Sequence, residues 1–291
     1  MDPIPLKAWI AQGLEWLRLN FGAVFDGFAR AITACDASLE FALRSIPPWA
    51  LILVVAGVLI WRRGFGIAVA VSAALLLVWD LRLWNDGMHT VSLALMSAGI
   101  SIVLGVPLGI LVAESRRADR LITPVLDYMQ TTPAFVYLIP SVVFFGIGAA
   151  PGVFATVMFA LPPLTRNVAL GIREVDPRTI EAVKAFGATP LTVLTKVKLP
   201  LALPYFAIGI NQCIMMSFSM VVMAALIGAR GLGTLVVASL AQVDFPAGIE
   251  AGVAVVAIAV ALDQMSRPAL GRFRRKWRFR RRQKREPAPA P

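Results

Sequence analysis

Long apolar stretches separated by short polar segments dominate the chain. Measured against the roughly 20 apolar residues that one bilayer crossing needs, this pattern predicts about seven transmembrane helices. They lie near residues 47–62, 64–80, 88–113, 121–148, 150–172, 201–229 and 247–266. The fourth stretch is unusual because polar residues precede its apolar half, and polar side chains at membrane depth face protein or water. We therefore expect an all-α integral membrane protein.

The first 46 residues show a different pattern. Between residues 4 and 45, apolar and aromatic residues recur at near-helical spacing, with charged residues between them. This spacing predicts an amphipathic helix. It lies either on the outer leaflet of the membrane or against the protein's own spans, and the sequence leaves both alternatives open.

Composition and charge exclude a soluble domain and set an orientation. The chain is 58% hydrophobic with a net charge of +11, and its mean hydropathy is +0.75. Lysine and arginine gather between the first and second, third and fourth, and fifth and sixth stretches, and after the seventh. The positive-inside rule places these segments in the cytoplasm, so we expect the N-terminus outside and the C-terminus inside.

The basic tail, residues 267–291, has two interpretations. Its basic residues can act only as a topology anchor, or they can adhere to anionic lipid, with salt weakening that adhesion. Binding to nucleic acid is not expected of a tail tethered to the membrane. The residues that we nominate for the lipid contact are Arg272, Arg274, Arg275 and Lys276.

A polar segment between the fifth and sixth stretches carries its own local signals. Asp176 can cap a helix that begins at Pro177, and Gly187 can end that helix in a left-handed conformation. Thr189 can open a second short helix, which we expect to end near Pro200. Two short helices that meet at a glycine outside the membrane offer a surface for a cytosolic partner.

Catalytic and metal-binding patterns are not found in the sequence. Cys35 and Cys213 match no metal or redox spacing, and we expect both to pack as small hydrophobic residues. The single histidine, His89, is expected to be structural or interfacial. No phosphate-binding Gly-x-x-x-x-Gly-Lys-Ser/Thr loop is present, and ionisable residues within the apolar stretches are scarce. We therefore predict no catalytic residue and no metal site, and an energy source in another chain.

Two motifs carry a family resemblance. Glu181-Ala182-Val183, followed by Gly187 and then Val197-Lys198-Leu199-Pro200, resembles the EAA loop of bacterial ATP-binding-cassette import permeases. The run Met129-Gln130-Thr131-Thr132-Pro133-Ala134-Phe135 is similar to one in permeases of glycine betaine, proline betaine and choline importers. Residues 159–163 and 211–233 share that similarity, whereas Thr165-Arg166-Asn167-Val168 departs toward polar residues and leaves the role of Arg166 open.

The resemblance implies a type I import permease in the bacterial cytoplasmic (inner) membrane. Its core would be residues 87–266, with a coupling loop at 173–200 and two accessory helices at 47–86. It implies a second copy of the chain, two ATP-binding subunits that hold ATP and Mg, and an extracytoplasmic substrate-binding protein. The implied cargo is a small quaternary ammonium compound, and the alternative is another small solute, such as an amino acid or related osmolyte. The implied contacts with the ATPase are Ile180, Glu181, Ala182, Val183, Phe186 and Gly187.

Residues of the translocation path can be nominated on the fourth and sixth stretches. Methionine and phenylalanine side chains can contact a methylated cation without a fixed charge partner. The same residue types also form helix interfaces, so both interpretations stay open. The candidates are Asp127, Gln130, Thr131, Thr132, Asn211, Gln212, Met215, Met216, Phe218, Ser219 and Met220.

Overall fold

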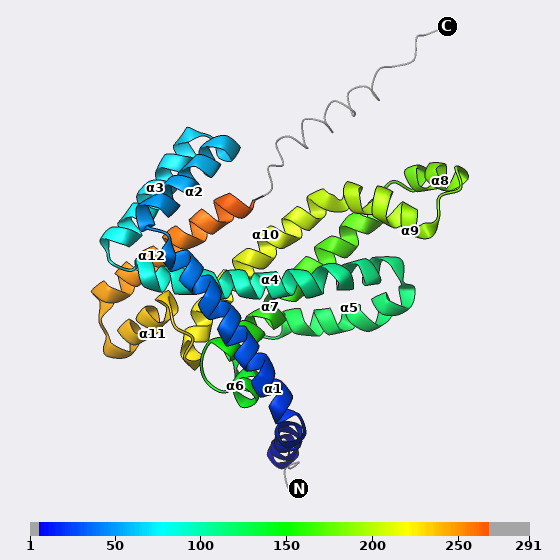
Figure 1. Cartoon of the computed structure of the whole chain (residues 1–291). Helices are drawn as coiled ribbons and strands as arrows, with labels where there is room; N and C mark the ends of the chain where they lie inside the picture. Colours follow the sequence, from blue (N-terminus) through cyan, green and yellow to red (C-terminus); the bar gives the residue numbers. More distant parts are fainter. Residues whose placement is uncertain (1–5, 268–291) are drawn as a thin grey trace.

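The computed structural model describes residues 6–267, and this part of the chain is helical throughout (Figure 1). Short 3-10 helices lie at Ala134–Tyr137 and Ala225–Ile227, and a π-helix lies at Leu194–Lys198. The α-helices are α1 (Leu6–Ser45), α2 (Pro48–Arg63), α3 (Phe65–Asp80), α4 (Trp84–Glu114), α5 (Arg116–Thr131), α6 (Leu138–Phe145), α7 (Ala149–Arg173), α8 (Pro177–Ala185), α9 (Pro190–Val193), α10 (Leu199–Ala224), α11 (Leu232–Gln242) and α12 (Phe245–Ser266).

Four long helices in the described part of the chain are apolar enough to cross a membrane. They are Trp84–Glu114, Ala149–Arg173, Pro190–Ile227 and Phe245–Ser266. A fifth span is possible if Gln12–Ser45 and Pro48–Arg63, which meet at a bend of 89°, count as one. Helices α2 and α3 have 16 residues each, which is short for a crossing. The fold is therefore that of a helical membrane protein with four to five long spans.

The centre of the bundle is α7, which packs between α4 and α10. Glycines permit these close approaches. A Cβ atom on Gly109 would lie 2.7 Å from the carbonyl oxygen of Thr165, and one on Gly171 would lie 2.5 Å from Cβ of Tyr205. Small residues at such contacts are typical of helix pairs in membranes, where close packing replaces the hydrophobic effect. This tight core holds the elements of the functional site in place.

The fourth predicted span, near 121–148, is not one continuous helix. Helix α5 ends at Thr131, the chain turns at Pro133, and α6 begins at Leu138. Proline lacks the donor that a helix needs and disfavours helical geometry in the residue before it. The Thr132 side chain donates a hydrogen bond to the Tyr128 carbonyl oxygen over 2.9 Å. The break places the predicted polar residues at the end of α5 rather than within a straight span.

Helix α1 is the amphipathic helix that the sequence predicts, and it packs on α4, α6 and α7. Ser92 of α4 donates to the Asp36 carboxylate over 2.7 Å, and His89 lies 2.9 Å from Glu40. The ring of Phe25 lies 4.9 Å from that of Phe144, between centroids. His89 thus lies at the contact between α1 and α4, where a structural or an interfacial role stays a prediction.

The other side of α1 is rich in exposed aromatic residues. Trp9, Trp16 and Phe41 are 61%, 59% and 76% exposed, respectively. The helix therefore contacts the protein's own spans on one side and presents large apolar side chains on the other. These two features correspond to the two alternatives that the sequence left open.

Candidate functional site

Helix α8 and its caps, residues 176–187, form a structure that we call the knob. The Asp176 carboxylate accepts a hydrogen bond from the backbone N–H of Arg178 over 2.9 Å, and Pro177 occupies the first turn. Gly187 has a φ of +83°, in the left-handed region, and its N–H bonds to the Lys184 carbonyl. The capping pattern predicted from the sequence is therefore confirmed on both ends.

The knob projects from the bundle. No residue of α8 is buried, and α8 contacts little besides α9. Figure 1 shows α8 beyond the ends of α7 and α10, at the opposite end of the bundle from α11. Phe186 is 93% exposed, a costly position for a large aromatic ring unless a partner covers it. Of the other nominated contacts, Glu181, Ala182 and Gly187 are exposed, and Ile180 and Val183 are half-buried.

The second short helix does not end near Pro200, so that expectation is wrong. Helix α9 continues through the π-helix into α10, forming one apolar helix from Pro190 to Ile227. The N–H of Leu199 bonds to the carbonyl of Leu194, five residues earlier. This wider turn accommodates the proline, whose ring would strike the carbonyl four residues earlier in a regular α-helix. Helix α9 is thus continuous with α10, and only Ala188 and Thr189 separate it from the knob.

The other end of the loop is held by Arg173, at the end of α7. Its guanidinium donates to the Val112 carbonyl over 2.7 Å and pairs with the Asp119 carboxylate at 3.0 Å. Asp119 precedes the predicted fourth span. Hydrogen bonds from Thr123 and then from Arg173 lower the pKa of the Asp119 carboxyl below its usual value. The carboxylate is therefore ionised at neutral pH and available to hold the arginine.

A matching contact holds the start of α10. Lys198 Nζ lies 2.6 Å from a carboxylate oxygen of Glu114, at the end of α4. Glu114 and Asp119 flank the turn between α4 and α5, so both ends of the knob's loop are tied to one corner of the bundle.

A band of polar side chains crosses α5, α7 and α10, and we call it the polar surface. Arg166 of α7 forms an ion pair with Asp127 of α5. The next residue, Asn167, donates a hydrogen bond to the side chain of Gln212 on α10 over 3.1 Å. The polar surface consists of Asp127, Gln130, Thr131, Arg166, Asn167 and Gln212, and Gln130 and Thr131 are exposed one turn beyond Asp127.

The remaining path candidates divide into separate environments. Thr132 is half-buried at the break after α5, and Met216 packs against the core cluster around Ala98 and Leu164. Met220 is 1% exposed and lies within the core, so it is not presented to any open surface.

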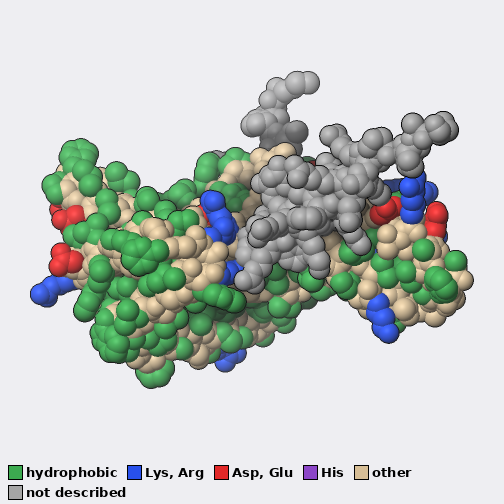
Figure 2. Space-filling view, turned by 90° about the horizontal axis from the view of Figure 1, so that it is seen from above, with side chains coloured by type: hydrophobic (Ala, Val, Ile, Leu, Met, Phe, Trp, Pro, Cys, Tyr) green, Lys and Arg blue, Asp and Glu red, His purple; other side chains and the backbone are tan. Residues whose placement is uncertain are grey.

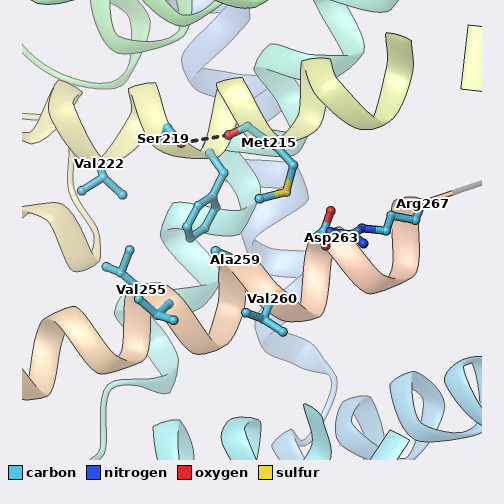
Figure 3. Close-up of a pocket in the computed structure, with 10 residues that line it drawn as sticks. Met215, Ser219, Val222, Val255, Ala259, Val260, Asp263 and Arg267 are labelled. Atoms are coloured by element: carbon cyan, nitrogen blue, oxygen red, sulfur yellow. Dashed lines mark hydrogen bonds and ion pairs between the residues drawn. The ribbon is translucent and has the colours of Figure 1, made fainter. Parts of the chain in front are cut away.

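Three path candidates, Met215, Phe218 and Ser219, line a cavity of about 430 Å³ between α10 and α12 (Figure 3). Valine and alanine side chains of α12 form the opposite wall. Figure 3 shows Asp263 and Arg267 at one end of this cavity, with 2.7 Å between their charged groups. Nearby, Ser266 donates a hydrogen bond to Asn211 over 2.7 Å and joins α12 to α10.

Two residues of the polar surface were not nominated from the sequence. Arg166 and Asn167 follow the paired prolines of α7 and appeared only as a departure from the family pattern. The available signal was the arginine itself, because a charged residue within an apolar span is costly and usually functional. Its partner, Asp127, lies 39 positions away in the chain, and sequence spacing does not show that they meet.

Other expectations are settled only in part. Cys213 is buried as expected, whereas Cys35 is exposed because α1 turns that face outward. The lipid-contact residues Arg272, Arg274, Arg275 and Lys276 lie outside the described residues. On the uncovered part of the face in Figure 2, hydrophobic side chains are widespread and charged side chains form a few separate groups.

Comparison with known proteins places the chain in a family. Residues 105–266 match the family of the binding-protein-dependent transport system inner membrane component. The chain is 43% identical to the glycine betaine transport system permease protein OpuAB of Bacillus subtilis, over 90% of this chain and 93% of the relative. It is 43% identical to the glycine betaine/carnitine transport permease protein GbuB of Listeria monocytogenes, over 90% and 94% of the two chains.

A third relative and a solved structure agree with this placement. The chain is 40% identical to the glycine betaine/proline betaine permease protein ProW of Escherichia coli, over 94% of this chain and 78% of the relative. A structure of the inward-facing MetNI methionine transporter matches with a TM-score of 0.55 and 24% identity, over 64% of this chain and 95% of the other. That likeness shows the permease fold alone. The chain therefore belongs to the family of inner membrane permease components of binding-protein-dependent transport systems, non-catalytic subunits whose ATPase is a separate chain.

Proposed function

We propose that this chain is the membrane permease of an ATP-driven importer for glycine betaine and related quaternary ammonium compounds. The observation that carries the proposal is an identity of 40% to 43% with three glycine betaine permeases, over at least 90% of the chain. The alternative is another small solute, such as an amino acid or related osmolyte. The likeness to the methionine transporter gives little support to that alternative, because it is limited to the fold.

The proposed complex contains two copies of this chain, two ATP-binding subunits and an extracytoplasmic substrate-binding protein. The exposed knob supports this assembly, because Phe186 and the half-buried Ile180 and Val183 form an apolar patch that nothing in the described chain covers. Each chain offers one such knob, and an importer with two ATPases needs two. ATP and Mg would bind to the ATPase chains.

Coupling follows from the contacts at the base of the knob. Closure of the ATPases on ATP would displace α8. Arg173 and Lys198 would carry that displacement to the corner between α4 and α5, and α10 would carry it along its own axis. Because α7 packs tightly between α4 and α10, these helices would move together and alternate the access of the path.

The proposed topology has seven spans, with the N-terminus outside and the C-terminus in the cytoplasm. Helices α2 and α3 would be accessory spans within residues 47–86, before a core at 87–266. If α2 crosses the membrane, the 89° bend leaves α1 roughly parallel to its surface. The exposed aromatic residues of α1 fit the interface between water and lipid.

The polar surface is the proposed wall of the translocation path. Its six side chains have no place in lipid, where polar groups are costly, so they would face a water-filled cavity or the second copy. Ser219, also exposed on α10, would extend this wall. The cavity that Met215 and Phe218 line would be its apolar neighbour.

The basic tail is the proposed lipid contact. Arg272, Arg274, Arg275 and Lys276 would hold it on anionic lipid, and rising salt would release it. Transport measured over a salt series, with and without residues 272–291, tests this role. Equal salt dependence in the two proteins would leave only a topology anchor.

Reconstitution tests the transport function. The permease, its ATPase and its binding protein are placed in liposomes, and ATP-dependent uptake of labelled glycine betaine, choline and methionine is measured. We expect uptake of glycine betaine. Uptake of methionine alone would favour the alternative, and ATP-dependent uptake of neither quaternary compound would refute the proposed cargo.

A further inference from the structure

The ion pair between Arg166 and Asp127 lies about two helical turns in from the end of α7. Arg166 is seven residues before the end of α7 at Arg173, which corresponds to about 10 Å along the helix axis. Its side chain is 40% exposed and that of Asp127 is 56% exposed. An exposed ion pair at this depth cannot face lipid without a large cost. It must therefore face water, a second protein surface or a cargo.

The surroundings of the pair are polar but uncharged. Gln130 and Thr131 extend the surface along α5, and Asn167 and Gln212 extend it across to α10. Helix α10 contains no charged residue, and the only charged residues of α7 are Arg166 and Arg173. Because Arg173 is engaged at the corner below the knob, the polar surface presents one cation and one anion, side by side.

Asp127 accepts from only part of the hydrogen-bond donors of the Arg166 guanidinium. One hydrogen bond joins the two side chains, from an Nη of Arg166 to one oxygen of Asp127. The Nε of Arg166 is buried and has no hydrogen-bond partner among the described residues. A guanidinium carries five N–H donors, so Arg166 retains donors on the exposed part of its side chain for a second carboxylate.

We propose that this pair is a contact site for a zwitterionic cargo, which rests on the function proposed above. Glycine betaine carries one carboxylate and one quaternary ammonium group. Its carboxylate would take the place of Asp127 on Arg166, and its ammonium group would lie against the released Asp127 carboxylate. No covalent bond changes, and every charge keeps a partner throughout the exchange.

The exchange explains why such a costly pair can suit a path rather than a high-affinity site. Replacing one ion pair by two gives little net gain, because each new contact offsets one that is lost or a hydration shell that is removed. The cargo would be oriented and still free to leave. A cation without a carboxylate, such as choline, would engage Asp127 alone and gain nothing from Arg166.

The test uses the complete importer in liposomes and the double variant Arg166→Gln with Asp127→Asn. The two new amides can still hydrogen-bond to each other, so the contact between α5 and α7 is kept while both charges are removed. In this variant the charged groups of the cargo would give up hydration without gaining a charged partner, which should lower the glycine betaine transported per ATP hydrolysed about tenfold. The ATPase rate that the loaded binding protein stimulates should stay within about twofold, because the knob and its base are unchanged.

Arg120→Gln is the matched control, because it removes an exposed arginine from α5 outside the polar surface. It should leave the transport ratio at the wild-type value. An unchanged ratio in the double variant would overturn the proposal. So would a fall in uptake and ATPase rate by the same factor, because that result would assign the pair to assembly. Absence of glycine betaine uptake by the wild-type importer would instead refute the function on which the proposal rests.

Discussion

Two short helices between spans, α8 and α11, differ in how they pack against the bundle. Both follow the end of a long helix and both are bounded by a glycine with positive φ, Gly187 at +83° and Gly231 at +132°. In α11, Leu232 is fully buried, and its N–H bonds to the hydroxyl of Thr90 over 2.9 Å. In α8 no residue is buried. Helix α11 is therefore anchored in the core, whereas α8 is held by its own caps.

This difference between α8 and α11 predicts that changes in α11 affect the stability of the chain and that changes in α8 affect its proposed coupling to the ATPase. A change in α11 disturbs contacts within the chain, whereas a change in α8 leaves those contacts intact and alters only what the knob presents to a partner. The following predictions test this separation, from the largest effect to the smallest.

Gly231→Ala should have the largest effect. A Cβ atom there would lie 2.4 Å from the Thr90 hydroxyl, and the backbone conformation is one that only glycine adopts readily. We expect a destabilisation of about 3 kcal/mol or more, from backbone strain and overpacking together. The measurement is the thermal unfolding midpoint of the detergent-solubilised protein. Gly57→Ala, in open space within α2, is the control and should leave that midpoint unchanged.

Phe186→Asp should abolish coupling and leave the fold intact. The ring is 93% exposed, so its loss removes little internal packing, whereas a carboxylate would lose its hydration in the proposed apolar contact with the ATPase. We expect transport to fall at least about tenfold, as for the loss of an interface hot spot, with no change in the unfolding midpoint. Phe65→Asp, which changes a 73% exposed ring on α3 far from the knob, is the control and should keep transport near the wild-type value. Normal transport by the Phe186 variant would show that the knob is not the ATPase contact.

Gly187→Ala should have an intermediate effect. No atom lies within 4 Å of the added Cβ, so the only cost is that of a left-handed conformation, about 1 kcal/mol. The knob would lose part of its cap, and we expect uptake per ATP to fall about fivefold. Comparison with Gly231→Ala separates backbone strain alone from strain combined with overpacking. Equal losses of thermal stability in the two variants would contradict the distinction between α8 and α11.

Reversal of the Glu114–Lys198 pair should have the smallest effect. Each single reversal places like charges together at the base of the knob and should reduce transport about threefold, since partly exposed pairs contribute up to about 1 kcal/mol. The double variant Glu114→Lys with Lys198→Glu should recover most of the loss. A double variant as poor as the single ones would argue against transmission through this contact.

Local chemistry was predictable from the sequence, and contacts between distant residues were not. Asp176 and Gly187 act within one helix turn of their positions, so their capping roles follow from residue type alone. The prediction that a helix ends near Pro200 was wrong, because the π-helix that precedes this proline lets the helix continue. The break at Pro133 was also missed, since the apolar run 134–145 continues past it.

The polar surface shows the same limit. Gln130 and Gln212 were nominated as polar residues in apolar stretches, and the structure places both near Arg166 on one side of the bundle. Their common face depends on how α5, α7 and α10 pack, which no single stretch of sequence encodes. The pairing of Arg166 with Asp127 is the part that only three-dimensional packing supplies.

The π-helix at Leu194–Lys198 also sets the rotational phase between the knob and the polar surface. One residue advances an α-helix by about 100°, so the extra residue in the wide turn fixes the direction in which Gln212 points relative to Phe186. A change in the number of residues in this turn would therefore also rotate α10 relative to the knob. A permease shortened by one residue within this turn would keep both its knob and its span, and would turn Gln212 away from the polar surface.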